Sequence, residues 1–167
     1  TGSGCILLSI LKELIFSKGI GIDISKKAIQ IAKVNSNNLN LFKRAKFKVY
    51  DISKFSLGKY DLIISNPPYI PSREIRFLSK DIIHYEPLIA LNGGFDGLDL
   101  IKKVIYKSEI LLKKNGLLAI EIGNKQYKRV SDILGKHGFR EICKEYDYKH
   151  NVRCIISTKI DFFKLKK

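Results

Sequence analysis

The sequence predicts an α/β protein with an open, mostly parallel, twisted sheet and helices on both faces. Segments with apolar residues at helical spacing alternate along the chain with short apolar runs typical of strands. The last two of these runs have no helix between them, so we expect one of them to be antiparallel. The chain of 167 residues has the length of one domain. We place that domain at residues 1–160, followed by a basic tail at 161–167.

The chain opens on a turn, Thr1-Gly2-Ser3-Gly4, which leads into a predicted helix over Cys5–Phe16. The helix prediction rests on apolar residues that recur on one face: Ile6, Leu7, Ile10, Leu11, Leu14 and Ile15. A Gly-Ser-Gly turn that opens a helix normally follows a strand. No strand precedes it in this sequence, so we expect a fragment from which the N-terminal strand is missing.

The next segments continue the alternation. Ile20–Ile24 is predicted to be a short strand, and Ser25 has the side chain to cap a helix that runs to about Asn35. Two further apolar runs, Lys46–Tyr50 and Tyr60–Ser65, are predicted to be strands.

A loop from Asn66 to about Asp96 follows, and its unusual length indicates a functional role. We expect Gly116 to end the helix that comes after this loop. The remaining predicted elements are a helix at Leu98–Leu112, a strand at Leu117–Ile122, a helix at about Lys125–Lys136, and strands at Arg140–Tyr146 and Arg153–Thr158.

Composition limits the classes of function only weakly. The net charge of +15 would suit a polyanionic partner. However, 25 of the 31 basic residues are lysines scattered along the chain, which AT-biased coding would also produce. Nucleic-acid binding is therefore the less favoured interpretation of the charge. The three cysteines lack metal-ligand spacing, and no apolar run or leader suggests a membrane or secretion, so we expect a cytoplasmic protein without a metal.

Polar residues at predicted strand ends suggest a nucleotide-like ligand. Gly2 and Gly4 would let a ligand approach the backbone closely at a helix N-terminus. Asp23 ends the following strand, where an acidic side chain accepts hydrogen bonds from ribose hydroxyls in doubly wound sheets. Asp51, followed by Ile52, could accept from an adenine amino group, or could equally be a turn-forming residue before Ser53.

The stretch Ser65-Asn66-Pro67-Pro68-Tyr69-Ile70-Pro71 contains three of the four prolines of the chain. Proline fixes φ and has no N–H, so this turn is stiff and its carbonyls remain unpaired. The Asn66 side-chain oxygen and the Pro67 carbonyl would form a fork of two acceptors beside the flat face of Tyr69. A fork of this kind suits a planar NH₂ group, whose nitrogen could then act as a nucleophile.

In this order and spacing, the TGSG turn, Asp23, Asp51 and NPPY resemble a Rossmann-like class I S-adenosylmethionine-dependent methyltransferase. The NPPY form is similar to enzymes that methylate amide or exocyclic amino nitrogens. Three stretches, NPPYIP, YEPLIALNGGFDGLD at 85–99 and Glu121-Ile122-Gly123, resemble the release-factor glutamine methyltransferase family in particular.

That resemblance implies methyl transfer from S-adenosylmethionine to N5 of the glutamine in the GGQ loop of peptide chain release factors, by a monomeric enzyme. It assigns the cofactor's methionine part to Thr1, Gly2, Ser3 and Gly4, its ribose to Asp23, and its adenine to Asp51 and Ile52. It assigns the substrate glutamine to Asn66, Pro67, Pro68 and Tyr69, with Asn66, Pro67 and Tyr69 catalytic and Asn66 also next to the methyl donor. Family members usually carry a small N-terminal helical domain that this sequence lacks.

Several alternatives share parts of this pattern. A ribosomal-protein glutamine methyltransferase has nearly the same motifs. An adenine-N6 or cytosine-N4 methyltransferase acting on RNA or DNA also needs a fork for a planar NH₂ group. A non-enzymatic cofactor-binding or assembly protein would have no physical need for the fork. His84, His137 and His150 suggest no catalytic triad, and we expect them to be solvated or packed.

Overall fold

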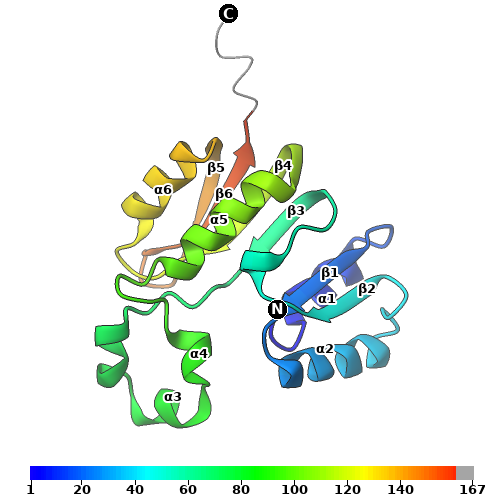
Figure 1. Ribbon diagram of the computed structural model, residues 1–167, viewed down its shortest axis with the longest axis horizontal. Helices are drawn as coiled ribbons and strands as arrows, with labels where there is room; N and C mark the ends of the chain where they lie inside the picture. Colours follow the sequence, from blue (N-terminus) through cyan, green and yellow to red (C-terminus); the bar gives the residue numbers. More distant parts are fainter. Residues whose placement is uncertain (161–167) are drawn as a thin grey trace, which may run out of the picture. The chain divides into compact units, whose positions relative to one another are not determined.

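The computed structural model describes residues 1–160 as two compact units, Thr1–Phe55 and a second that begins at Ser56 (Figure 1). The predicted tail at 161–167 lies outside the described residues. Both units are built from strands with helices packed against them.

The first unit has a two-stranded parallel sheet. Its elements are α1 (Cys5–Glu13), β1 (Gly19–Asp23), α2 (Lys26–Asn38), β2 (Ala45–Val49) and the short 3-10 helix η1 (Ile52–Lys54). Asp23 pairs with Val49 in the register, so the two strands end side by side. Both helices and β2 share one buried core, formed by Leu8, Leu11, Ile29, Ala32, Leu41, Ala45 and Phe47.

Local sequence signals explain where these helices begin, and one of them ends earlier than predicted. Ser25 caps α2 as predicted, because its Oγ accepts a hydrogen bond of 3.2 Å from the Ala28 N–H. The prediction that the first helix reaches Phe16 was wrong. The chain turns after Glu13, and the Arg44 guanidinium donates to the carbonyls of Leu14 and Ser17, each at 3.1 Å. A long-range side chain thus satisfies the carbonyls that follow the helix.

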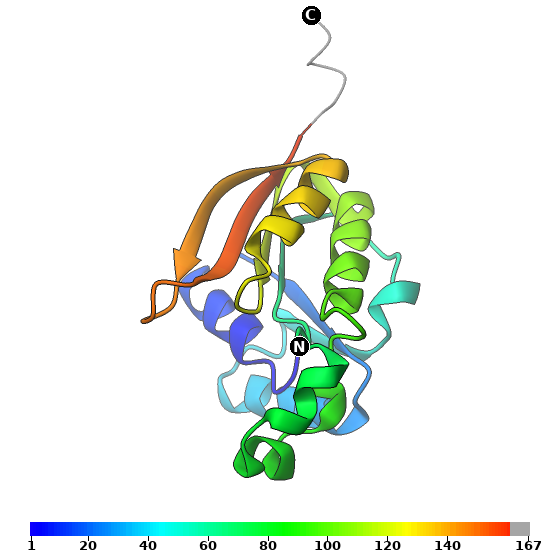
Figure 2. The ribbon, with the colours of Figure 1, turned by 90° about the vertical axis from the view of Figure 1, so that its left-hand side faces the viewer.

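The second unit contains a four-stranded mixed sheet in the order β3-β4-β6-β5. β3 and β4 are parallel, and β6 is antiparallel to both of its neighbours, which confirms the predicted antiparallel strand near the C-terminus. Two long helices pack on this sheet, side by side (Figures 1 and 2). The bounds are β3 (Tyr60–Ser65), α5 (Asp99–Leu111), β4 (Leu112–Glu121), α6 (Tyr127–Lys136), β5 (Phe139–Tyr146) and β6 (Val152–Lys159).

The long connection predicted between Asn66 and about Asp96 contains three short helical segments. These are η2 (Ser72–Phe77), α3 (Lys80–Tyr85) and α4 (Leu88–Leu91). Each has four to six residues, which is too short to show a helical repeat in the sequence. Residues 81–90 are all exposed, so no apolar stripe marks this region as helical.

The assignment of Gly116 as the end of the preceding helix was also wrong. α5 ends at Leu111, and Gly116 lies within β4 where the pairing with β3 shifts register. Asn115 has a φ of 59° at this irregularity, and a Cβ on Gly116 would approach the Lys113 carbonyl oxygen to 2.9 Å. Gly116 is therefore needed for a bulge between strands and not for a helix end.

Across residues 1–160, no helix is both long and apolar enough to cross a bilayer.

Candidate functional site

The turn before α1 has the backbone geometry that its glycines predict. Gly2 and Gly4 have φ angles of 57° and 82°, in the left-handed region that side chains avoid. The Gly4 N–H donates to the Thr1 carbonyl at 3.1 Å, which closes the turn. A Cβ on Gly4 would lie 2.9 Å from the Phe47 ring, whereas one on Gly2 would meet nothing within 4 Å. Gly4 therefore serves both conformation and packing, and Gly2 serves conformation alone.

Asp23 holds this turn. One carboxylate oxygen accepts from the backbone nitrogens of Thr1 at 3.0 Å and Gly2 at 2.8 Å, and the other accepts from the Ser25 N–H at 2.9 Å. Partial burial raises the pKa of Asp23, but the hydrogen bonds from the Ser25 and Gly2 N–H groups together with the amino group of Thr1 lower it more, so its pKa lies below 3.8. The structure thus brings the predicted residues Thr1, Gly2 and Asp23 together, with Asp23 ionised at neutral pH.

Asp51 caps the short helix η1, because its side chain accepts a hydrogen bond of 2.8 Å from the Ser53 N–H. This is the turn-forming role given above as one of two interpretations. Asp51 is exposed and Ile52 half-buried, and β2 ends at Val49, two residues before Asp51. The adenine-binding role of Asp51 and Ile52 stays a prediction.

The predicted acceptor fork follows the last residue of β3, Ser65. Pro67 is buried and Asn66 is exposed, so the proline anchors the turn while the amide faces solvent. Among residues 1–160, no hydrogen bond is made by the Asn66 side chain or accepted by the Pro67 carbonyl. Both oxygens keep their capacity to accept hydrogen bonds from a ligand.

Tyr69, the next predicted site residue, is held by contacts from distant parts of the chain. Its hydroxyl lies 3.4 Å from a Glu121 carboxylate oxygen and 3.5 Å from an Arg153 guanidinium nitrogen. Burial and the Glu121 carboxylate raise the pKa of Tyr69, and Arg153 offsets part of this effect. The hydroxyl is therefore neutral at physiological pH, and the ring is fixed at its outer end.

Sequence reasoning missed two residues beside Tyr69. Arg153 is the first: its guanidinium lies 5.8 Å from the centre of the Tyr69 ring and donates to Asp147 at 3.1 Å. Gln126 is the second: its side chain donates to the Tyr69 carbonyl at 2.9 Å. Neither could be recognised as a site residue from the sequence, because Arg153 lies 84 positions and Gln126 57 positions from Tyr69. The EIG stretch next to Gln126 was the one available signal.

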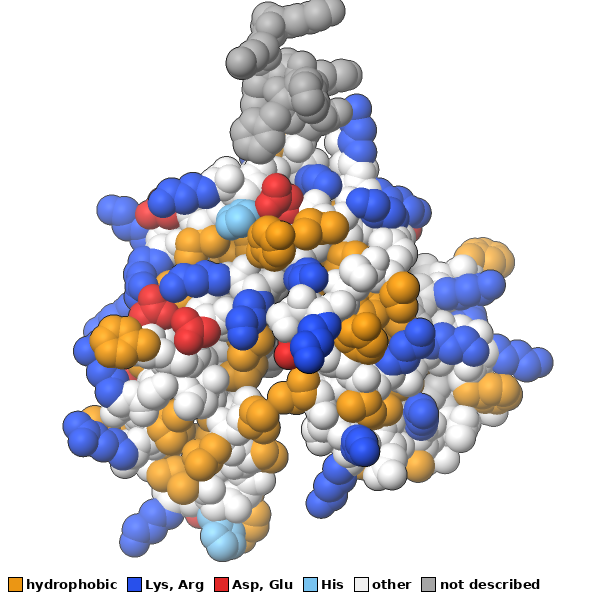
Figure 3. All heavy atoms as spheres, viewed as in Figure 1, with side chains coloured by type: hydrophobic (Ala, Val, Ile, Leu, Met, Phe, Trp, Pro, Cys, Tyr) orange, Lys and Arg blue, Asp and Glu red, His pale blue; other side chains and the backbone are white. Residues whose placement is uncertain are grey.

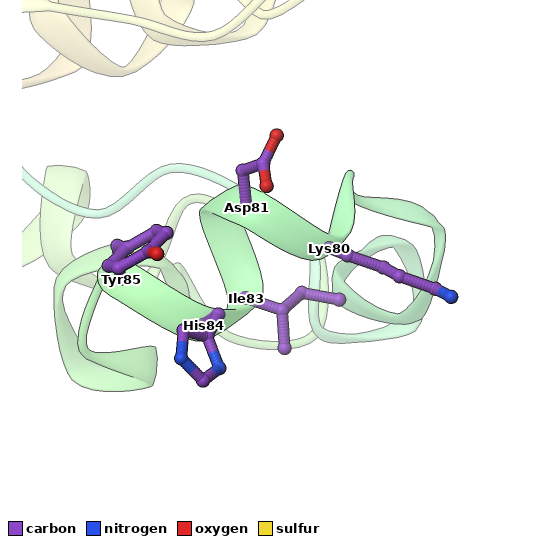
Figure 4. A pocket seen from close by; sticks show the side chains of 5 residues that line it. All are labelled: Lys80, Asp81, Ile83, His84 and Tyr85. Atoms are coloured by element: carbon purple, nitrogen blue, oxygen red, sulfur yellow. The ribbon is translucent and has the colours of Figure 1, made fainter.

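A hollow on α3 contains none of the predicted site residues. Its lining residues, Lys80, Asp81, Ile83, His84 and Tyr85, all belong to this one short helix. Figure 4 shows their side chains fanning outward in different directions instead of converging on one point. A ligand site normally needs convergent polar groups, so the hollow supports no binding function.

The histidines and the surface charge add no further site. His137 Nδ1 lies 2.7 Å from a Glu109 carboxylate oxygen, and the ring of His84 packs edge-on against Tyr85. In the described part of the chain, no three His, Cys, Asp or Glu side chains are grouped as metal ligands. On the face seen in Figure 3, lysines and arginines are scattered among apolar and uncharged side chains and do not form one basic patch.

The structure combines parallel strand pairs and helices with a glycine turn at a helix N-terminus and an acidic residue at a strand end. These features are typical of Rossmann-like proteins that bind nucleotide cofactors. The chain belongs to the methyltransferase domain family, whose family model matches residues 1–164. The fold is shared with a ribosomal protein L11 methylase from Lactobacillus delbrueckii subsp. bulgaricus. The two structures match with a TM-score of 0.70 and 16% sequence identity, over 96% of this chain and 67% of the methylase chain.

Curated relatives are more similar in sequence. The chain is 39% identical to a release factor glutamine methyltransferase from Clostridium acetobutylicum, over 95% of this chain and 57% of the relative. It is 38% identical to one from Rhodospirillum rubrum, over 95% of this chain and 49% of the relative. The chain thus spans about half the length of the curated relatives it matches.

Proposed function

We propose that this chain is the methyltransferase part of an enzyme that transfers a methyl group from S-adenosylmethionine to the side-chain amide nitrogen of a glutamine in a peptide chain release factor. The observation that carries this proposal is that the two acceptors of the predicted fork, the Asn66 side chain and the Pro67 carbonyl, have no hydrogen-bond partner within residues 1–160, while the carbonyl of the nearby Tyr69 is held by Gln126. The names of the relatives, which are 38–39% identical, support the choice of a glutamine amide in a release factor.

The residues of the first unit fit the proposed cofactor. Gly2 and Gly4 place no side chain at two positions of the turn before α1, which allows a ligand to approach the backbone there. The two oxygens of a carboxylate offer about four acceptor positions, and the turn uses three of those on Asp23. The Asp23 side chain keeps 21% of its surface exposed, so it can accept from a ribose hydroxyl while still holding the turn.

The residues of the second unit fit a primary amide. Asn66 Oδ1 and the Pro67 carbonyl can accept its two N–H groups, while Tyr69 provides a flat surface for the conjugated plane. An amide nitrogen is a poor nucleophile because its lone pair is delocalised. Two acceptors that hold both hydrogens favour a more tetrahedral nitrogen and stabilise the positive charge that develops on it.

Bound S-adenosylmethionine would supply an electrophilic methyl group on a sulfonium. The nitrogen–carbon bond would form as the sulfur–carbon bond breaks, S-adenosylhomocysteine would leave, and the amide nitrogen would release one proton to solvent. The contribution of the protein is therefore positioning and hydrogen bonding. This scheme gives no role to His137, which is paired with Glu109.

The test uses the protein that carries this chain, with methyl-labelled S-adenosylmethionine. Purified release factors, ribosomal subunits, RNA and DNA are offered in parallel reactions. We expect label on a release factor, and loss of that label when the GGQ glutamine of the release factor is replaced. Label on ribosomal subunits that resides on a ribosomal protein would assign the same amide chemistry to that substrate, and label on nucleic acid would assign the fork to a base amino group. Either result would overturn the proposed substrate.

A further inference from the structure

Gln126 is a buried polar side chain that uses both of its donor positions and accepts one hydrogen bond at its oxygen. Only 6% of the surface of this residue is exposed to solvent. Oε1 accepts from the Gly123 N–H at 2.8 Å, and Nε2 donates to the carbonyls of Tyr69 at 2.9 Å and Gly97 at 3.3 Å. Two carbonyls need the NH₂ end and one N–H needs the oxygen, so the orientation of the amide is fixed by its partners.

Two glycines, Gly97 and Gly123, lie directly against the Gln126 side chain, and a third, Gly93, lies against Tyr69. A Cβ on Gly97 would lie 2.6 Å from Gln126 Nε2, and one on Gly123 would lie 2.9 Å from Gln126 Oε1. A Cβ on Gly93 would lie 2.8 Å from the Tyr69 Cα. Each distance is too short for a real side chain, so these segments approach one another as closely as bare backbone allows.

Backbone hydrogen bonds join the same segments. The Ile70 N–H donates to the Leu91 carbonyl at 3.1 Å, and the Gly93 N–H donates to the Ile70 carbonyl at 2.8 Å. Gln126 is thus the one described side chain that connects the Tyr69 loop, the Gly97 loop and the turn after β4 at the same time.

We propose that Gln126 is a positioning residue that fixes the carbonyl of Tyr69, and through it the acceptor fork of Asn66 and Pro67, by acting as a neutral carboxamide. The inference rests on the proposed function for its catalytic consequence. Gln126 does not touch the substrate amide. It acts through Tyr69, two residues after Pro67, and a small displacement of a fork that must hold both hydrogens of an amide is costly to the rate.

The first test compares Gln126→Met with Gln30→Met. Methionine keeps the volume of Gln126 but can neither donate to the two carbonyls nor accept strongly from Gly123. Gln30 is exposed on α2 and is the only other glutamine of the sequence, so Gln30→Met is a matched control. We expect Gln126→Met to lower kcat for release-factor methylation by about 10-fold or more, with an unchanged Kd for S-adenosylmethionine. A kcat equal to that of the parent protein would overturn the proposal.

The second test, Gln126→Glu, separates positioning from a merely structural role. A glutamate carboxylate would face the Tyr69 and Gly97 carbonyls without a proton to donate, whereas the protonated acid can donate to one of them. Burial raises the pKa of such a group. We expect the activity of Gln126→Glu relative to the parent to rise about threefold or more as the pH falls from about 8 to 6. A reduced ratio that stays constant over this range would overturn the proposal.

Amide hydrogen exchange gives a readout that does not need activity. In Gln126→Met we expect the Ile70 and Gly93 N–H groups to exchange about 10-fold or more faster, while Gln30→Met leaves them unchanged. Unchanged exchange at both groups would overturn the positioning role even if the parent protein methylated no release factor. Failure of the proposed function, shown by an inactive parent, is thus distinguishable from failure of this inference.

Discussion

The turn before α1 and the loop after β3 both contain predicted site residues, but they are held in different ways. The first is held from within its own unit, because Asp23, 22 and 21 positions from Thr1 and Gly2, accepts hydrogen bonds from their backbone nitrogens. The second is held from far along the chain, by Gln126 at the Tyr69 carbonyl and by Glu121 and Arg153 near the Tyr69 hydroxyl. Neither motif contains its own support, but the partner of the turn is the acidic residue at the end of the next strand, whereas the partners of Tyr69 lie 52 to 84 positions away.

The largest expected effect concerns the hydrogen-bond acceptors of the loop after β3. Replacement of Asn66 by alanine removes one of the two acceptors of the fork. We expect the rate of methyl transfer to a release factor to fall by about 10²–10³-fold, the usual cost of losing one hydrogen-bonding partner of a developing charge. The measurement is initial rate under saturating cofactor.

Stability provides the control for this substitution. Asn66 is exposed and its side chain makes no hydrogen bond within residues 1–160. Asn66→Ala should therefore leave Tm nearly unchanged, as should Asn124→Ala, a matched exposed asparagine in the same unit. An Asn66→Ala protein that retains the parent rate would end the role assigned to the fork.

The next effect tests the distant support of the loop. Gly97 has a φ of 76°, and a Cβ there would overlap the Tyr69 carbonyl oxygen and lie 2.6 Å from Gln126 Nε2. Gly97→Ala should lower the free energy of unfolding by at least ~2 kcal/mol, because it combines backbone strain with overpacking. Gly135→Ala in α6 meets nothing within 4 Å and should stabilise by ~0.5–1 kcal/mol. Denaturant unfolding of the two variants would contradict this account if their effects were alike.

Substitutions of the two glycines in the turn before α1 should have smaller effects on stability, and the two effects should differ. Gly4→Ala introduces a Cβ at a φ of 82° and 2.9 Å from the Phe47 ring, and should cost ~2 kcal/mol of unfolding free energy. Gly2→Ala introduces only the strain of a left-handed backbone, ~1 kcal/mol, since a Cβ there has open space around it. Thermal unfolding of both variants measures the difference. Equal losses would mean that packing against Phe47 adds nothing.

The sequence predicted best those features that depend on neighbouring residues. β3 runs from Tyr60 to Ser65 as expected, because an apolar run is followed at once by Asn-Pro-Pro, which cannot continue a ladder. The cap of α2 at Ser25 was confirmed for the same kind of reason. Asp23 is an exception, since it lies against the Gly2 turn although 21 positions separate them; here the order of strand ends in a doubly wound sheet brought the two together.

Features that depend on distant residues could not be predicted in this way. The first helix ends early where Arg44 binds the carbonyls of Leu14 and Ser17. Gly116 belongs to a bulge that is defined by pairing with β3. Gln126 was missed because its three partners lie in separate segments, so its neighbours in the sequence say nothing of its role. The periodicity of apolar residues and the spacing of motifs carry no information about contacts between distant segments.

The smallest expected effect concerns the stability of the folded protein in acid. Each of the two regions contains a carboxylate whose pKa is lowered: Asp23 at the turn and Asp147, which pairs with Arg153 beside Tyr69. The Asn151 N–H, with Lys149 and Arg153, lowers the pKa of Asp147 from 3.8 to about 2. Because the pKa is lower in the folded protein, the stabilisation is complete above about pH 4 and is lost as the pH falls toward 2.

Asp147→Asn should therefore be slightly less stable than the parent at pH 7, with a gap that closes as the pH approaches 2. The gap should be small, since asparagine can still accept from the backbone of Asn151 and loses mainly its charge toward Arg153. Thermal unfolding at a series of pH values is the measurement. A gap that stays constant between pH 5 and pH 2 would show that the ion pair with Arg153 contributes nothing to the support of the Tyr69 loop, and that support would then rest on Gln126 and Glu121.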